Sequence, residues 1–281
     1  MAQLKLSAFA DEYSNNFDKQ IEYLVQNNID YIELRFLDGK NIADMNSQEV
    51  EAAAQKLEAA GIGVSSIGSP LGKINIEDDF DKHMEKAKRV FEAANIVGTK
   101  NIRMFSFYLP EGKTREQCRD WVLHRLDKLA ALAQQYNVTL CHENEAKIYG
   151  ESPEQCLDIL SHFSGTIKCV FDMGNFVLDG YKPFPDAYNL LKDYIEYFHI
   201  KDSLYAGAIV PPGCGEAGIP EIFEAVKQDF DRDIFVTLEP HLQTFDGLNQ
   251  LVGKTFDNPY KFETGEIAFE EAVKRIKEIL A

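Results

Sequence analysis

Short apolar runs alternate along the whole chain with longer segments whose apolar positions recur every three or four residues. The short runs have the pattern of buried strands, and the longer segments have the pattern of helices with one apolar face. Strands are expected at 4–9, 31–35, 62–68, 101–107, 138–143, 166–172, 195–200 and 233–239. A helix-forming segment follows each strand, for example at 47–60, 79–95 and 114–136.

This repeated order of strand and helix predicts a parallel sheet, and eight such pairs predict a closed (β/α)8 TIM barrel. The length of 281 residues suits one barrel without a linker, so 1–281 is expected to be a single domain. A doubly wound open sheet is the alternative, and it is disfavoured because no glycine fingerprint follows the first strand. The stretch 240–265 lacks periodicity, and a long loop at this place is expected to cover the active-site face.

Four strands of the second half end on a side chain that can bind a metal ion. These residues are Glu143, Asp172, His199 and Glu239. In a parallel barrel the carboxyl ends of the strands meet at one rim, where barrel enzymes hold their catalytic groups. A single charged strand end is ordinarily an ion pair or a loop cap, but three converging carboxylates would repel one another and would be driven to protonate. Because a divalent cation removes this repulsion, the pattern predicts a metal site.

Three carboxylates and one imidazole make a fairly hard ligand set without thiolates. Mn²⁺, Mg²⁺ or Co²⁺ is therefore favoured, and Zn²⁺ is also compatible. His241 follows Glu239 by two residues and is expected at the same rim, where it can contact a substrate.

Further charged residues lie in or next to the other strands. They are Glu33, Arg35, Lys73, Arg103 and Lys201. Charge inside a barrel is costly unless it is paired, so structural salt bridges are one interpretation of these residues. The functional interpretation is a substrate-binding wall that faces the metal, where Arg and Lys side chains would bind a phosphate or a carboxylate.

The net charge of −17 removes the usual electrostatic driving force for binding nucleic acid, so no nucleic-acid partner is expected. No membrane partner is expected either, because no run approaches the roughly 18 apolar residues of a membrane span. The five cysteines show no paired framework, which fits a reducing compartment. With an N-terminus that is apolar for too few residues to be a signal peptide, these features predict a cytoplasmic protein.

Several short motifs at the strand ends resemble the xylose-isomerase-like barrel superfamily, in particular its branch of sugar isomerases and epimerases. The motifs are HENE (142–145), FDMGN (171–175), HIKD (199–202), LEPH (238–241) and GCGEAGIPEIF (213–223). The resemblance covers almost the whole chain. The glycine-rich part of the last motif precedes a helix and could cradle a phosphate, but it lacks the Walker lysine, and the resemblance implies a connecting turn there.

The resemblance implies that Glu143, Asp172, His199 and Glu239 hold one divalent ion. It also implies that the two glutamates act as acid and base on opposite faces of a substrate carbon. Many members have a histidine three residues after the metal-binding aspartate, and here that position is Asn175, a candidate substrate-binding residue. A histidine is also common where Glu145 stands. These departures bear on the reaction and leave the metal site intact.

The sequence thus predicts a divalent-metal-dependent isomerase or epimerase that acts on a small sugar, keto-sugar or sugar phosphate through a cis-enediolate. One alternative is a dehydratase of an inosose or keto-acid on the same site, and another is a non-enzymatic carbohydrate-binding barrel. An endonuclease of abasic DNA from the same superfamily is disfavoured, because that branch has more strand-end histidines and this chain has a charge of −17. Barrels of this type often pair, so a homodimer is the default expectation.

Overall fold

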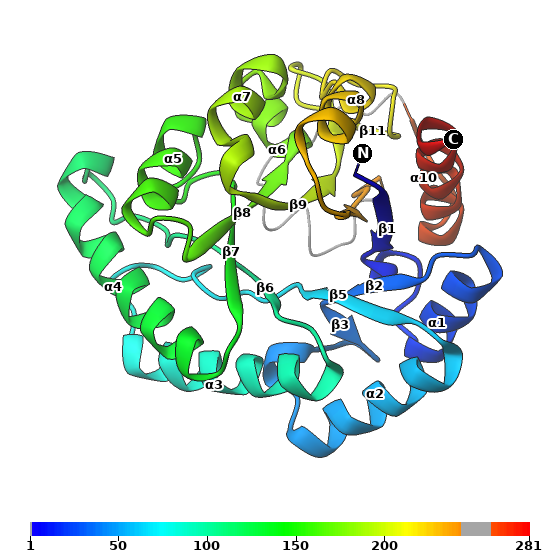
Figure 1. Cartoon of the computed structure of the whole chain (residues 1–281), viewed down its shortest axis with the longest axis horizontal. Coiled ribbons are helices and arrows are strands. Elements are labelled where there is room, and N and C mark those ends of the chain that lie inside the picture. Colours follow the sequence, from blue (N-terminus) through cyan, green and yellow to red (C-terminus); the bar gives the residue numbers. More distant parts are fainter. Residues whose placement is uncertain (1, 243–259) are drawn as a thin grey trace.

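Eight parallel strands surround a common axis in the computed structural model, which describes residues 2–242 and 260–281 (Figure 1). The strands are β1 (Leu4–Ala8), β2 (Tyr31–Leu34), β5 (Gly63–Ile67), β6 (Asn101–Met104), β7 (Thr139–Glu143), β8 (Ile167–Asp172), β9 (Ile195–Ile200) and β12 (Ile234–Leu238). Their hydrogen-bonded order is β1-β12-β9-β8-β7-β6-β5-β2, and β1 packs beside β2. The ring is nearly closed, which confirms the predicted TIM barrel.

The main helices lie outside the ring and cover the strands (Figure 1). They are α1 (Phe17–Gln26), α2 (Ser47–Ala60), α3 (Phe80–Val97), α4 (Arg115–Gln135), α5 (Pro153–His162), α8 (Ile219–Asp229) and α10 (Gly265–Leu280). Their ends follow the sequence: Asn46 and Glu49 form a capping box at the start of α2, and Gly61 ends this helix with φ 72°. Two short antiparallel ribbons, β3 (Phe36–Leu37) with β4 (Lys40–Asn41) and β10 (Asp202–Ser203) with β11 (Ile209–Val210), stand apart from the ring.

The fourth strand ends at Met104, three residues earlier than the sequence predicts. Beyond it the backbone pairs with the preceding loop, since Phe105 N donates to Leu71 O and Phe107 N donates to Gly72 O. Phe107 also has a positive φ of 68°, which no strand allows. The apolar residues of 105–107 therefore continue the strand pattern in the sequence but form a loop over the rim.

The segment after β8 also differs from the sequence prediction of one short helix at 185–194. A helix, α6 (Met173–Leu178), begins directly after Asp172, whose side chain accepts a hydrogen bond from Asn175 N. The later part is divided into η3 (Pro183–Ala187), α7 (Tyr188–Leu191) and η4 (Lys192–Tyr194). Phe184, which precedes Pro185, has φ −127° and ψ 135°, the extended conformation that a following proline favours.

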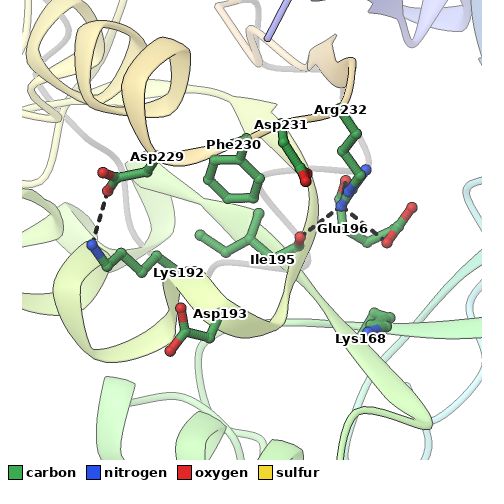
Figure 2. Close-up of a pocket in the computed structure, with 9 residues that line it drawn as sticks. All are labelled: Lys168, Lys192, Asp193, Ile195, Glu196, Asp229, Phe230, Asp231 and Arg232. Carbon is green, nitrogen blue, oxygen red and sulfur yellow. Dashed lines mark hydrogen bonds and ion pairs between the residues drawn. The ribbon is translucent and has the colours of Figure 1, made fainter. Parts of the chain in front are cut away.

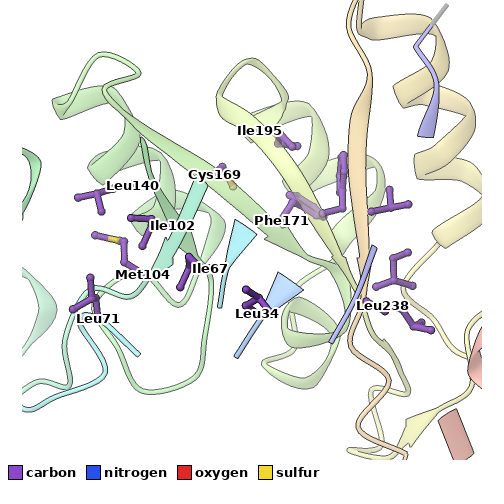
Figure 3. Close-up of a cluster of buried hydrophobic side chains, with 14 of the residues drawn as sticks. Leu34, Ile67, Leu71, Ile102, Met104, Leu140, Cys169, Phe171, Ile195 and Leu238 are labelled. Carbon is purple, nitrogen blue, oxygen red and sulfur yellow. The ribbon is translucent and has the colours of Figure 1, made fainter. Parts of the chain in front are cut away.

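Side chains alternate between the two faces of each strand. Outward apolar residues pack against the helices and form the main core, including Leu34, Ile102, Leu140 and Phe171 (Figure 3). The inward residues Cys141, Val170, Tyr197 and Phe235 form a second, smaller apolar cluster. Since Glu143, Asp172 and His199 lie two residues further along the same inward faces, this cluster is a floor beneath them.

Most of the loop predicted to cover the active-site face, residues 243–259, lies outside the described residues. In the part of the chain that is described, no helix has the length and apolar character needed to cross a membrane.

Candidate metal centre

Glu143, Asp172, His199 and Glu239 converge at the carboxyl end of the barrel, as their strand-end positions predict. One ligand atom from each lies within 4.8 Å of the others, and all four side chains are buried. His199 Nδ1 is 3.1 Å from Glu143 Oε1 and 3.3 Å from Glu239 Oε2. They come from β7, β8, β9 and the residue after β12, which are consecutive neighbours in the ring.

The donor geometry fits a divalent cation. With bonds of about 2.0–2.2 Å to each ligand, neighbouring donor atoms stand roughly 3–3.5 Å apart, which matches the distances around His199 Nδ1. Glu143 Oε2 and Glu239 Oε2 are also buried without a hydrogen-bond partner among the described residues. Buried carboxylate oxygens are rarely left without partners, so these two atoms indicate a place for a cation.

The imidazole of His199 is held from below by a chain of hydrogen bonds. Its Nε2 atom lies 3.2 Å from Glu33 Oε2, and Tyr197 OH donates to Glu33 Oε1 over 2.9 Å. Ser66 Oγ lies 2.9 Å from the same hydroxyl. Glu33 therefore turns Nδ1 of the ring towards the other ligands, in the way that metal-binding histidines are commonly oriented by a carboxylate.

Asp172 is fixed by contacts at its backbone and its carboxylate. Its N–H donates to Asn144 Oδ1 and its carbonyl accepts from Asn144 Nδ2, over 2.9 and 3.0 Å. Its two carboxylate oxygens accept hydrogen bonds from Asn175 N at 2.8 Å and from Lys201 Nζ at 3.0 Å. Asn175 accepts a further hydrogen bond from Lys201 through Oδ1. Asn175 and Lys201, both expected as substrate-binding residues, thus lie directly against a metal-ligand candidate.

Two arginines contact the glutamates from the other side of the site. Arg35 Nη1 donates to Glu239 Oε1 over 2.7 Å, and the rest of its guanidinium group pairs with Asp11 and Glu12. Arg103 Nη1 lies 3.3 Å from Glu143 Oε2 and 3.6 Å from Glu239 Oε1. Because it reaches both glutamates, Arg103 stands between the two candidate proton carriers.

Burial and the charges of neighbouring side chains determine the protonation of the ligands. Burial acts to raise the pKa of Glu143, but the positive charges of His199 and Arg103 outweigh it and hold this pKa at about 2. The pKa of Glu239 is likewise well below its usual value, because Lys201 and His241 overcome the effect of burial. For Asp172 burial dominates over the nearby Lys201 and raises the pKa to about 6. Both glutamates are therefore ionised at neutral pH and can accept a proton.

His241 lies at the rim, as the sequence predicts, with its Nε2 atom 3.3 Å from Glu12 Oε1 and 3.4 Å from Glu239 Oε1. Glu12, Glu239 and His241 could together hold a cation. The guanidinium of Arg35 is already within 3.2 Å of both carboxylates and offsets part of their negative charge.

Lys73 lies further out, where Lys73 Nζ pairs with Glu145 Oε2 over 2.7 Å and stands 4.5 Å from the centre of the Phe105 ring. The side chains of Lys73 and Glu145 are 32% and 24% exposed, whereas the ligand side chains are at most 3% exposed. This ion pair and His241 are therefore more exposed than the four ligands.

A different hollow, of about 310 Å³, lies at the opposite end of the barrel (Figure 2). Its walls include Lys168 and Ile195, which stand near the starts of β8 and β9. Its charges pair with one another, as in Lys192 with Asp229 and Arg232 with Glu196. Since barrel enzymes use the carboxyl ends of their strands, this hollow is not the candidate active site.

A comparison with known protein families identifies the family of this chain. Residues 21–279 match the family described as xylose isomerase-like TIM barrel. The chain belongs to this family. The strand-end motifs already indicated this family. The relatives described next include enzymes of the family that act on small molecules.

Three known proteins resemble this chain in sequence or in structure. The 3-dehydroshikimate dehydratase of Bacillus anthracis is 22% identical over 243 residues, covering 80% of this chain and 85% of that protein. The D-allulose 3-epimerase of Methylomonas sp., solved with D-allulose, has a TM-score of 0.74 at 17% identity and covers 99% of this chain and 98% of that chain. The IOLI protein, solved with a zinc atom, has a TM-score of 0.74 at 18% identity and covers 98% of both chains. At these identities the structural likeness shows the shared fold.

Sequence reasoning does not identify Asp11, Glu12, Asn144 or Tyr197 as part of the site. Asp11 and Glu12 come three and four residues after Ala8, the last residue of β1, so charge close to a strand end is the available signal. Asn144 lies between two residues of the HENE motif, and only the folded chain shows that its amide pairs with Asp172. Tyr197 is two residues before His199 on an apolar strand, where an aromatic residue is ordinarily core.

Proposed function

We propose that this protein is a divalent-metal-dependent isomerase or epimerase of a small polyhydroxylated carbonyl compound. The observation that carries the proposal is the pair of buried carboxylates, Glu143 and Glu239. Their Oε2 atoms have no hydrogen-bond partner among the described residues, and one oxygen of each lies within 3.3 Å of His199 Nδ1. A metal-ligand set that also contains two ionised carboxylates supplies both the binding site and the proton carriers that such a reaction needs.

Glu143, Asp172, His199 and Glu239 would hold the ion, with Mn²⁺, Mg²⁺ or Co²⁺ favoured over Zn²⁺ on ligand hardness. A bound divalent ion would supply Lewis-acid polarisation of the substrate carbonyl and the adjacent hydroxyl. Glu33 would keep the imidazole of His199 in the binding orientation, and Asn144 would keep Asp172 in place.

Proton movement would fall to the two glutamates. One of them removes the proton from the carbon next to the carbonyl, which leaves a cis-enediolate. The other, which is ionised in the resting centre, takes up a proton from solvent and delivers it to the opposite face of that carbon in an epimerisation, or to the neighbouring carbon in an isomerisation, while the first glutamate releases its proton to solvent. The guanidinium of Arg103 reaches both carboxylates and can stabilise negative charge that develops on the substrate between them.

The sequence likeness to 3-dehydroshikimate dehydratase of Bacillus anthracis supports a second candidate, a dehydratase on the same site. In that reaction the enediolate expels a β-hydroxyl group instead of receiving a proton. Product mass distinguishes the two, because only elimination removes water from the substrate.

The test is solvent-deuterium incorporation into a panel of ketoses, ketose phosphates and inososes by the metal-reconstituted protein. We expect Glu239→Gln and Glu143→Gln to keep the fold and to lose exchange, and Asp172→Ala to lose the metal. Persistent exchange in either glutamine variant would refute the proton-carrier role, and full metal occupancy in Asp172→Ala would refute its role as a ligand.

A further inference from the structure

The basic side chains at the candidate centre are already paired with carboxylates of the protein. Arg35 contacts Asp11, Glu12 and Glu239 at 2.8, 3.2 and 2.7 Å. Its hydrogen-bonding edge is therefore occupied by three anions. The sequence suggests that Arg35 could bind an anionic substrate group, but four of its five N–H donors already donate to these carboxylates.

The other three cations at the centre also stand next to protein acceptors, although the Nε atom of Arg103 is buried without a hydrogen-bond partner among the described residues. Arg103 lies between Glu143 and Glu239 and donates through Nη2 to Gly68 O. Lys201 Nζ is 3.0 Å from Asp172 Oδ2 and 3.4 Å from Glu239 Oε2. At the more exposed mouth, Lys73 pairs with Glu145 over 2.7 Å. A substrate phosphate would have to compete with at least one protein carboxylate for every one of these groups.

Backbone donors at the rim are occupied as well. Barrel enzymes often bind phosphate at the loops after their seventh and eighth strands, and the seventh strand here is β9. In the loop after β9, the carboxylate of Asp202 accepts hydrogen bonds from Gly213 N, Gly215 N and Ala217 N at 2.8, 2.9 and 3.1 Å. The glycine-rich segment thus has the form of an anion cradle, and a side chain of the protein fills it.

The packing around this carboxylate leaves no room for a second anion. A Cβ atom built on Gly215 would lie 2.1 Å from Asp202 Oδ1, so the loop is closed tightly over that group. Asp202 is buried, and its neighbour in sequence is Lys201, which holds Asp172. Most of the loop after the eighth strand lies outside the described residues.

The charges of the described site also disfavour an anion. Six carboxylates, those of Asp11, Glu12, Glu33, Glu143, Asp172 and Glu239, face three permanently charged cations, Arg35, Arg103 and Lys201. A divalent ion would leave the group close to neutral rather than positive. An anionic substrate would therefore gain little net attraction from the site and would meet a carboxylate beside each of these cations.

We propose that the centre selects uncharged polyhydroxylated carbonyl compounds and rejects their phosphate esters and carboxylates. The inference rests on the proposed function, because it names the substrate class of that same site. Hydroxyl groups suit the surroundings, since each hydroxyl can both donate to a carboxylate and accept from a cation that remains paired. A phosphate offers only acceptors to a rim rich in acceptors.

The experiment measures deuterium uptake from D2O by mass spectrometry with the Mg²⁺-loaded protein. The uncharged probes are D-allulose, D-fructose and D-tagatose, and the anionic probes are fructose 1-phosphate, fructose 6-phosphate and 3-dehydroshikimate, the last also followed for loss of water. We expect exchange with at least one uncharged ketose to be about a hundredfold faster than any reaction of an anionic probe, because an anion placed beside the carboxylates of the centre is disfavoured.

Faster reaction of any anionic probe would overturn the substrate class while leaving the metal-dependent enzyme in place. If no probe reacts, the proposed function fails for these compounds. The preference of the centre for uncharged compounds is then tested by ligand binding alone. Thermal stabilisation by millimolar inorganic phosphate or by either ester, without stabilisation by the ketoses, would then overturn it, and the absence of that stabilisation would support it.

A variant provides a directional check. Glu145→Gln releases Lys73 from its carboxylate partner at the mouth, so binding of fructose 6-phosphate relative to D-fructose is expected to rise by up to about fivefold. The Lys40 pair with Glu49 is exposed and belongs to a ribbon and helix outside the ring, so Glu49→Gln is the matched control. An unchanged ratio in Glu145→Gln would contradict the view that paired carboxylates hide these cations.

Discussion

The Nε2 atom of His199 lies 3.2 Å from Oε2 of Glu33, on the side of the ring opposite to the one that faces Glu143 and Glu239. Both side chains are fully buried. One imidazole therefore joins a carboxylate of the first half of the chain to the ligand set of the second half. This relationship gives Glu33 a specific effect on metal binding that can be measured without knowledge of the substrate.

Glu33→Gln is expected to lower the affinity for Mn²⁺ or Zn²⁺ by about 10- to 100-fold, because the imidazole loses the carboxylate that orients it and raises its basicity. Calorimetric titration of the apo protein measures this affinity. Tyr197→Phe keeps the carboxylate and removes one of its hydrogen bonds, so its loss should be smaller. Equal affinities in wild type and Glu33→Gln would show that Glu33 does not act through His199.

Lys201→Met should destabilise the metal-free protein by about 3 kcal/mol, because it leaves the buried carboxylates of Asp172 and Glu239 without their shared ammonium. Urea unfolding in the presence of a chelator measures the loss. Addition of Mg²⁺ should recover more stability in the variant than in wild type. Lys227→Met, at an exposed ion pair with Glu224, serves as the control and should cost less than about 1 kcal/mol. Equal losses of stability in the two variants would contradict the view that Lys201 balances the two buried carboxylates.

Gly174→Ala tests how closely α6 approaches Lys201. A Cβ atom at Gly174 would lie 2.6 Å from Lys201 Cγ and 2.8 Å from Lys201 O. Alanine is intrinsically the better helix former by about 1 kcal/mol, so local propensity alone predicts a stabler protein. We expect instead a loss of about 1–3 kcal/mol from overpacking, together with weaker metal binding as Lys201 moves. A raised Tm would show that the contact relaxes freely.

His83 gives a prediction for pH. Burial, with smaller contributions from Lys86 and Arg125, lowers the pKa of His83 to about 4, and its Nε2 atom accepts a hydrogen bond from Gly72 N at 3.0 Å. Below pH 6.5 His83 is protonated in the unfolded chain, whereas in the folded chain it stays neutral until the pH falls to about 4. The stability that this group contributes is thus fully present above the unfolded pKa. It decreases as the pH falls from the unfolded pKa to the folded pKa, by up to about 1.4 kcal/mol per pH unit.

Urea unfolding of His83→Gln between pH 4.5 and 7.5 checks this slope, since glutamine keeps an acceptor for Gly72 N but does not titrate. Its stability should fall less steeply towards acid than that of wild type. Part of the slope should remain, because burial also lowers the pKa of His142 to about 4. His124→Gln, on the exposed face of α4, should match wild type, and a slope unchanged in His83→Gln would contradict the assignment.

The barrel could be predicted from the sequence because its signal is repeated eight times and each repeat is local. The convergence of the four strand-end ligands followed from the barrel, since parallel strands place their carboxyl ends together. Strand ends were less predictable: the apolar residues at 105–107 look like a strand, yet their partners lie in the preceding loop. The division of 183–194 depends on prolines that interrupt a helical pattern.

The pairing of the charged residues could not be predicted from the sequence. Arg35, Lys73 and Arg103 look like a basic wall when they are read in order, because the pattern does not show that Glu239 or Glu145 faces them across the ring. The role of Asn144 depends on one side-chain geometry between neighbouring strands. Such contacts join residues far apart in the chain, and no local period records them.

The amide of Asn144 makes the two hydrogen bonds to Asp172 just where the backbone ladder between β7 and β8 stops at Glu143. A side chain thus extends the sheet by one rung, and it does so between two metal-ligand positions. The connecting segments that leave the rim begin beyond this clamp. The length and composition of the segment that follows Glu145 can therefore be exchanged, in evolution or by loop grafting, while the spacing of Glu143 and Asp172 is preserved.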